Sequence, residues 1–84
     1  MTEDEKLITA AEKGDLDAVK DAVKNGAEFF NVAMLKAAGQ GNLDVIKYLL
    51  RRGANNVPDA LKMAASSGRE DAVKYLLGKA DFRA

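Results

Sequence analysis

The amino-acid sequence predicts an all-α protein in which three helix-turn-helix units stack side by side as a short solenoid. The first observation is a repeat, because Gly14, Gly41 and Gly68 lie 27 residues apart and similar sequences surround each of them. The second is that apolar residues recur at helical spacing within each copy. The third is that no segment alternates apolar and polar residues as a half-buried strand does. A fixed period is typical of repeat proteins, in which each unit buries its apolar face against its neighbours.

The first helix of each copy is rich in alanine, and small residues there would let neighbouring helices approach closely. Thr2 and Glu5 have the spacing of a capping box at the start of the first of these helices. Pro58 suits the first turn of the third, where its missing amide hydrogen matters little. The residues in register are Leu7, Ala10 and Ala11 in the first copy, Met34, Ala37 and Ala38 in the second, and Leu61, Ala64 and Ala65 in the third.

The second helix of each copy follows a glycine that suits the left-handed end of a helix. Asp15 and Asn42 come next, and their side chains are expected to cap the second helices. These helices carry the larger apolar residues, and Leu50 of the middle copy is predicted to be a buried core residue. Gly26 and Gly53 are expected to end the first two of these helices.

A chain of 84 residues makes one small domain. We therefore predict a single domain over residues 1–84, with repeats at about residues 3–29, 30–56 and 57–82. The outer copies differ from the middle copy and are expected to act as caps of the stack. Phe82 is expected to seal the last helix pair.

One stretch of the middle copy, residues 37–54, carries a family resemblance. It has the order Ala-Ala, two residues, Gly, one residue, then Leu-Asp-Val-Ile-Lys-Tyr-Leu-Leu-Arg-Arg-Gly-Ala. This string resembles the ankyrin repeat, and the other copies follow it more loosely, so the resemblance covers about residues 6–82. It implies pairs of stacked helices that bind another protein.

Two departures from the ankyrin pattern affect what the resemblance implies. The family's Thr-Pro-Leu-His motif is absent, since its positions read Val-Ala-Met-Leu at residues 32–35 and Asp-Ala-Leu-Lys at residues 59–62. The usual period is about 33 residues, and the missing residues fall where ankyrin repeats carry a projecting β-turn finger. We therefore expect tight loops in place of fingers, similar to the short ankyrin-like repeats of some viral and microbial proteins.

Composition argues against several classes of function. The sequence has no cysteine and no histidine, which removes thiolate metal sites and the commonest general base. Thirteen basic and thirteen acidic side chains balance, so no global field attracts nucleic acid or an anionic membrane. The sequence therefore predicts no enzyme, no metal and no cofactor, and neither nucleic acid nor a membrane as partner. The first five residues do not resemble a signal peptide, and a cytoplasmic location, or the host cytoplasm for a viral protein, is expected.

Candidate binding residues are those that differ among copies whose core and capping residues agree. The resemblance places them on the concave strip formed by the first helices and on the adjoining loops. The residues of the strip are Glu12, Lys13, Lys36, Gln40, Ser66 and Ser67, with Phe29 beside it.

Other side chains have both structural and binding interpretations. Phe29 aligns with Asn56 and so occupies a position that tolerates a polar side chain, whereas Phe30 aligns with Val57 and is expected to fill the core. Tyr48 and Tyr75 either pack between helices or contact a partner. Arg51 and Arg52 either stabilise a helix end or contact an acidic partner.

The leading hypothesis is a protein-binding module, either an adaptor or a small inhibitor. The alternative is a self-associating or engineered repeat unit with a structural role. Residues 1–28 hold eight acidic and four basic side chains, so the rest of the chain carries the opposite imbalance. A monomer is expected, and this asymmetry leaves a weak head-to-tail dimer as the alternative.

Overall fold

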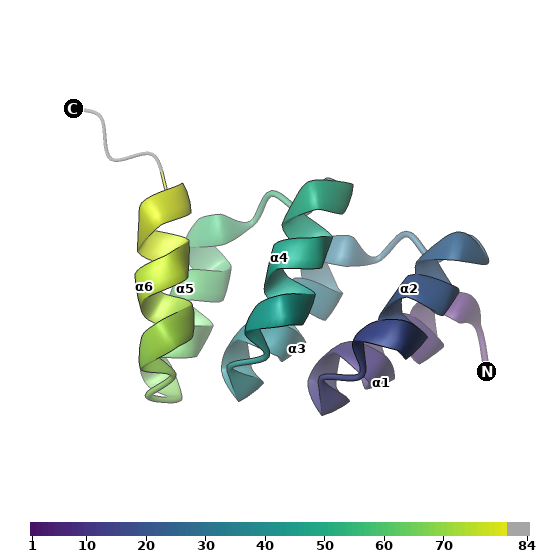
Figure 1. Cartoon of the computed structure of the whole chain (residues 1–84), viewed down its shortest axis with the longest axis horizontal. Helices are drawn as coiled ribbons and strands as arrows, with labels where there is room; N and C mark the ends of the chain where they lie inside the picture. The colour runs from purple at the N-terminus through teal and green to yellow at the C-terminus, as the bar shows by residue number, and fades with distance from the viewer. Residues whose placement is uncertain (81–84) are drawn as a thin grey trace.

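Six helices in three pairs make up the part of the chain that the structure describes (Figure 1). The computed structural model describes residues 1–80, and Phe82 lies outside them. The helices are α1 (Glu3–Lys13), α2 (Leu16–Lys24), α3 (Phe30–Gln40), α4 (Leu43–Arg52), α5 (Val57–Ser66) and α6 (Glu70–Lys79). Residues 1–80 contain no strand, and the predicted all-α stack of helix-turn-helix units is confirmed.

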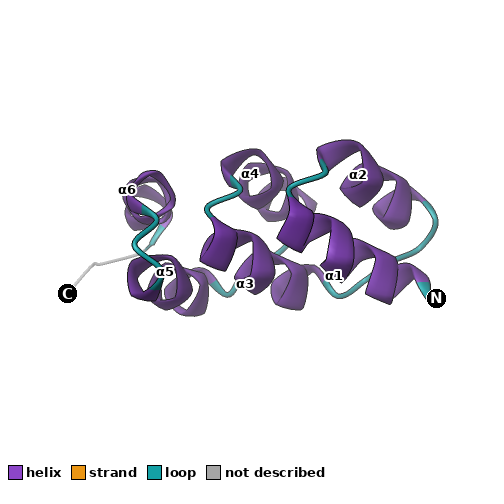
Figure 2. Ribbon diagram, turned by 90° about the horizontal axis from the view of Figure 1, so that it is seen from below, coloured by secondary structure: helices purple, strands orange, loops and turns teal. Residues whose placement is uncertain are grey.

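The helices form two layers, with α1, α3 and α5 in one and α2, α4 and α6 in the other (Figure 2). Within the first layer α1 packs along α3 and α3 along α5, whereas α2 touches α4 only slightly. The closer packing of the first helices curves the stack toward them and makes their layer the concave side. The principal extents are 40 × 24 × 15 Å, so each pair contacts chiefly its neighbours along the stack.

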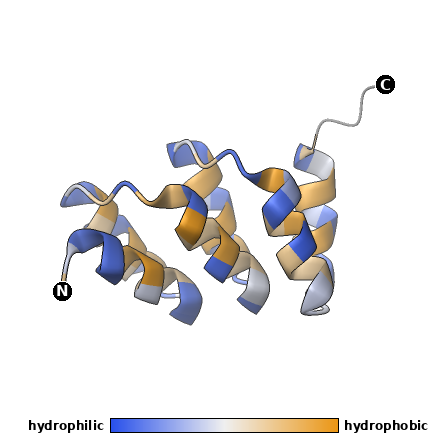
Figure 3. Ribbon diagram, turned by 180° about the vertical axis from the view of Figure 1, so that it is seen from behind, coloured by the Kyte–Doolittle hydropathy of each residue, from blue (hydrophilic) through white to orange (hydrophobic). Residues whose placement is uncertain are grey.

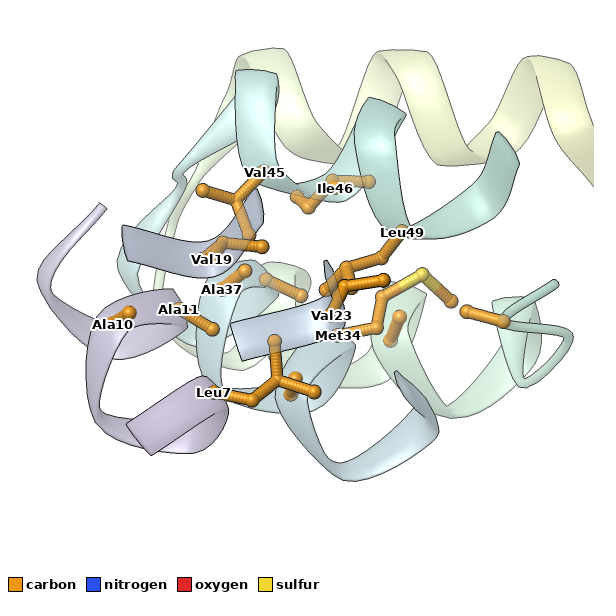
Figure 4. Packing of buried hydrophobic residues seen from close by; sticks show 14 of the residues in the cluster. Leu7, Ala10, Ala11, Val19, Val23, Met34, Ala37, Val45, Ile46 and Leu49 are labelled. Atoms are coloured by element: carbon orange, nitrogen blue, oxygen red, sulfur yellow. The ribbon is translucent and has the colours of Figure 1, made fainter. Parts of the chain in front are cut away.

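Alanine explains why the first helices pack so closely. Ala11, Ala37 and Ala38 are fully buried, and larger side chains fill the space between the two layers (Figure 4). The largest fully buried side chains are Leu7, Met34, Ile46, Leu49, Leu76, Val19 and Val45. Leu50 was predicted to belong to this core, but it is only half-buried. Adjacent residues on a helix point about 100° apart, and the turn of α4 that faces the first layer presents Leu49 instead.

The start of α1 has the capping box that the sequence predicts. The hydroxyl of Thr2 accepts a hydrogen bond from the Glu5 amide at 3.1 Å, and the Glu5 carboxylate accepts one from the Thr2 amide at 2.8 Å. The bond from the Thr2 backbone is the main reason why the pKa of Glu5 lies below its ordinary value, and the Thr2 hydroxyl adds to the effect. Pro58 lies in the first turn of α5, also as predicted.

The capping box has a testable pH dependence. Because the pKa of Glu5 is lower in the folded than in the unfolded chain, its contribution to stability is present above the unfolded value and is lost as pH falls through the folded value. We expect Glu5→Gln, which cannot ionise, to melt at a lower temperature than wild type at neutral pH. This difference should shrink in acid, and melting curves at several pH values will show it. Glu12→Gln, at the far end of the same helix, is the control, and an equal pH-dependent difference there would contradict the assignment to the cap.

Asn42 connects the first two helix pairs instead of capping α4. Its side-chain amide donates to the carbonyl oxygens of Ala11 at 2.9 Å and Glu12 at 3.1 Å, which belong to the last turn of α1. It makes no side-chain hydrogen bond at the start of α4. The expected cap is therefore wrong for Asn42, because its amide is used across the junction.

The two residues in register with Asn42 make different hydrogen bonds, because one side chain is a donor and the other an acceptor. Arg69 occupies the same position one period later, and its Nε donates to the carbonyl oxygen of Gly39 at 3.1 Å, across the second junction. Asp15 occupies it in the first pair and caps α2, because its carboxylate accepts from the Ala18 amide at 3.1 Å. The cap predicted for Asp15 is confirmed.

A second set of hydrogen bonds holds the loops between pairs. The carboxylate of Asp4 accepts from the backbone amides of Glu28 at 2.7 Å and Phe29 at 3.2 Å. One period later the Asn31 side chain accepts from the Asn55 amide and donates to the Asn55 side chain, both at 2.9 Å. The first helix of each of these two pairs thus fixes the loop that leads into the next pair.

Candidate functional site

The seven residues predicted to contact a partner are all exposed, but they occupy different parts of the concave side. Five of them lie at the C-terminal ends of the first helices, namely Glu12, Lys13, Gln40, Ser66 and Ser67. Lys36 lies one turn before the end of α3, and Phe29 lies at its start.

The five helix-end residues follow one another along the stack. The hydrogen bond from Asn42 to the Glu12 carbonyl oxygen brings the start of α4 against the end of α1. A β-carbon built on Gly39 would lie 3.5 Å from Cε of Met63 and 4.0 Å from Oγ of Ser67. The ends of α3 and α5 are therefore neighbours, and this part of the predicted strip is continuous.

Phe29 does not lie beside this strip. It is the N-cap residue of α3, whereas Gln40 is the last residue of the same helix. At 1.5 Å of rise per residue, the two positions are about 16 Å apart along the helix axis. A partner that contacts both groups must therefore extend along α3, past Lys36.

Phe29 is an unusual residue for its position. The N-cap positions in register with it hold Thr2, which forms the capping box, and Asn56, whose side chain donates to the Asn31 carbonyl oxygen at 2.9 Å. Phe29 makes no side-chain cap, and 53% of its surface is exposed. Its neighbour Phe30 is half-buried and packs against the core, as predicted.

An open groove begins at Phe29. Its volume is about 360 Å³, and it lies between the loop that precedes α3 and the loop that precedes α5. Its lining residues are Glu28, Phe29, Phe30, Asn31, Val32, Gly53 and Asn55. In Figure 3 hydrophobic residues colour much of the start of α3, next to the loop from α2. The groove can therefore receive an apolar side chain and offers carboxylate and amide groups at its rim.

A family model described as "Ankyrin repeats (3 copies)" matches residues 7–84. The chain belongs to the ankyrin-repeat family. The sequence matches no curated protein. Ankyrin repeats are generally protein–protein interaction modules, and the family is typically a non-enzymatic scaffold.

Short loops and apolar residues in the motif positions distinguish this ankyrin stack from the usual family pattern. The loops at residues 25–29 and 53–56 are short and contain no strand, as the shortened period predicts. In the motif positions 32–35, Ala33 and Met34 are fully buried. Apolar packing thus replaces the hydroxyl and imidazole groups of the usual motif.

Two exposed residues of this ankyrin surface were not identified from the sequence. Val32 on α3 and Met63 on α5 are 42% and 41% exposed. The residues in register with Val32 are Glu5 and Asp59, and those in register with Met63 are Thr9 and Lys36. An apolar residue at a position that is polar in both other copies is a signal that would have identified them, as it does Phe29.

Tyr48 and Tyr75 both make packing contacts within the ankyrin stack. Both rings are half-buried against the core. Nζ of Lys20 lies 5.8 Å from the centre of the Tyr48 ring, and Nζ of Lys47 lies 5.2 Å from that of Tyr75. Each ring therefore packs between helices, with a lysine from the preceding repeat within cation–π distance.

Within residues 1–80, no three His, Cys, Asp or Glu side chains come together as a metal site requires. None of the six helices is long and apolar enough to cross a membrane.

Proposed function

We propose that this ankyrin-repeat chain is a protein-binding module, an adaptor or a small inhibitor, whose partner docks on the concave side. The observation that carries the proposal is Phe29, a half-exposed aromatic at a position where the other repeats have a threonine and an asparagine. Aromatic residues are enriched among the side chains that dominate binding energy at protein interfaces.

Phe29 is unfavourable for the isolated chain in two respects. A side chain that caps a helix contributes about 0.5–2 kcal/mol, and phenylalanine cannot make this hydrogen bond. More than half of its surface remains in water, so much of the hydrophobic stabilisation of a buried ring is not realised. Burial of Phe29 by a partner would recover this stabilisation, and this supports a binding role.

The surroundings of Phe29 have the composition of an interface. Val32 lies beside it in the groove, and Met63 lies further along the concave side against the end of α3. Lys36, Gln40 and the serines Ser66 and Ser67 supply exposed polar groups further along the same side. A mixture of apolar and polar side chains is usual at protein–protein interfaces.

The test begins with the intact chain as bait in an interaction screen, followed by titration of each partner that binds. We expect Phe29→Ala and Gln40→Arg each to weaken binding by about 1 kcal/mol or more, which is about fivefold in the dissociation constant. Folding should change little, because exposed substitutions usually alter stability by less than about 0.5 kcal/mol. Circular dichroism and melting curves check this.

Matched controls lie on the opposite side of the stack. Lys24 on α2 and Lys74 on α6 are exposed and belong to the second-helix layer. Lys24→Ala and Lys74→Ala should leave affinity unchanged. Loss of affinity in these variants, with full binding by Phe29→Ala and Gln40→Arg, would show that the convex side binds instead.

A further inference from the structure

Carboxylates surround the exposed apolar residues at the start of α3. Phe29 and Val32 line the open groove there, and Glu28 lines it next to them. The Asp4 carboxylate lies at the same place, because it accepts hydrogen bonds from the Glu28 amide at 2.7 Å and from the Phe29 amide at 3.2 Å. Two acidic side chains therefore adjoin the apolar end of the concave side.

The helices on either side of α3 add one carboxylate each. Glu5 on α1 and Asp59 on α5 stand in register with Val32, and both are exposed. Because α1 packs along α3 and α3 along α5, these acids lie on the two sides of Val32. Within residues 1–80 the salt bridge is the one between Lys6 and Glu3, so no base in this part of the chain pairs with either acid.

The positive groups of this region do not offset the carboxylates. Lys36 follows Val32 by about one turn of α3. Arg52, at the end of α4, belongs to the other layer and does not line the groove, and Lys62 on α5 lines a separate one. The start of α3 has no side-chain cap, and its dipole is equivalent to about half a positive charge. One lysine and this half charge stand against four carboxylates, so the surroundings of the groove are negative.

We propose that the partner docks here through a segment that carries a large apolar side chain between two basic ones. This inference rests on the proposed function, because it takes Phe29 to be buried by a partner. The apolar side chain enters the groove against Phe29 and Val32, and a lysine or arginine on each side faces Glu5 or Asp59. Complementary charges around an interface speed the encounter and disfavour wrong partners. The same carboxylates repel an acidic segment.

The packing of the first helices sets the spacing within this segment. Packed helices lie about 8–10 Å apart, so Glu5 and Asp59 each lie at about this distance from Val32 across the stack. An extended chain advances about 3.3 Å per residue. A segment that crosses the starts of α1, α3 and α5 therefore has its basic residues about two or three positions before and after the apolar one.

A display library of random linear peptides, selected on the intact chain, tests the inference. The selected sequences should share a large apolar residue with lysine or arginine at this spacing on both sides. Synthetic copies of them should bind Phe29→Ala about fivefold or more weakly than wild type. Their affinity for wild type should fall as sodium chloride is added, because salt screens exposed ion pairs.

Charge variants identify the carboxylates that the peptides use. Glu28→Gln and Asp59→Asn should each weaken binding by about two- to fivefold, the range for exposed ion pairs. Asp59→Lys should bind a peptide with glutamate in place of the facing basic residue better than it binds the original peptide. Asp17→Asn also neutralises an exposed acid in the first turn of a helix, but on α2 in the other layer, and should leave affinity unchanged. Circular dichroism checks that each variant is folded.

The outcomes separate this inference from the proposed function. Peptides that depend on Phe29 but lack the basic residues overturn the inference and leave the proposed function intact. The same holds for peptides whose affinity does not change in Glu28→Gln and Asp59→Asn. A selection that yields no peptide dependent on Phe29 overturns both.

Discussion

Leu49→Ala should lower the free energy of unfolding by about 2–5 kcal/mol, the range for truncation of a fully buried leucine. Leu49 is 0% exposed, lies on α4 of the middle repeat and packs in the cluster between the two layers (Figure 4). A domain of this size has about 4–13 kcal/mol of stability at about 0.05–0.15 kcal/mol per residue, so the loss is a large part of the total. Denaturant unfolding followed by circular dichroism measures it.

Leu50→Ala is the matched control for this prediction. It makes the same chemical change one residue along the same helix, at a side chain that is only half-buried. The loss should be smaller than for Leu49→Ala, because less apolar surface returns to water and the cavity opens toward solvent. An equal or larger loss for Leu50→Ala would show that the core lies on the other side of α4.

Gly14→Ala should destabilise the stack more than the same substitution at Gly68. Both glycines follow a first helix and have left-handed backbones, with φ of 76° and 68°. An alanine in this conformation costs about 1–2 kcal/mol at either site. At Gly14 the new β-carbon would also lie 2.8 Å from Oδ1 of Asn42, whose amide holds the first junction. Displacing this side chain should add about 1–2 kcal/mol for the weakened hydrogen bonds.

The comparison between the two glycines separates backbone strain from the junction contact. A β-carbon at Gly68 meets nothing within 4 Å, so this variant reports the strain alone. Unfolding in denaturant gives both values. A double variant of Gly14→Ala with Asn42→Ala removes the clash, and its loss should be less than the sum of the two single losses. Equal effects at Gly14 and Gly68 would mean that Asn42 moves aside without loss.

Part of the candidate site could be predicted from the sequence. All seven predicted residues are exposed, because positions that differ among copies are positions that the core does not constrain. The same comparison of registers contained a stronger signal, since Phe29, Val32 and Met63 are apolar where other copies are polar. The alignment of the copies placed Phe29 beside the strip, but α3 runs for 11 residues between Phe29 and the end of the helix and so separates Phe29 from the helix-end residues.

The sequence by itself determined the number and order of the helices, the caps at the starts of α1 and α2, and the family. These features depend on local chemistry that recurs with the period, such as the capping box of Thr2, the glycines that end helices and the alanines of the first helices. Only the tertiary structure decided that Leu49 and not Leu50 is buried, and that Asn42 donates across the junction instead of capping its own helix. Both outcomes depend on how one helix is rotated and placed against its neighbours. The burial of a side chain and the partner of an amide are set by surrounding atoms that lie far away in the sequence.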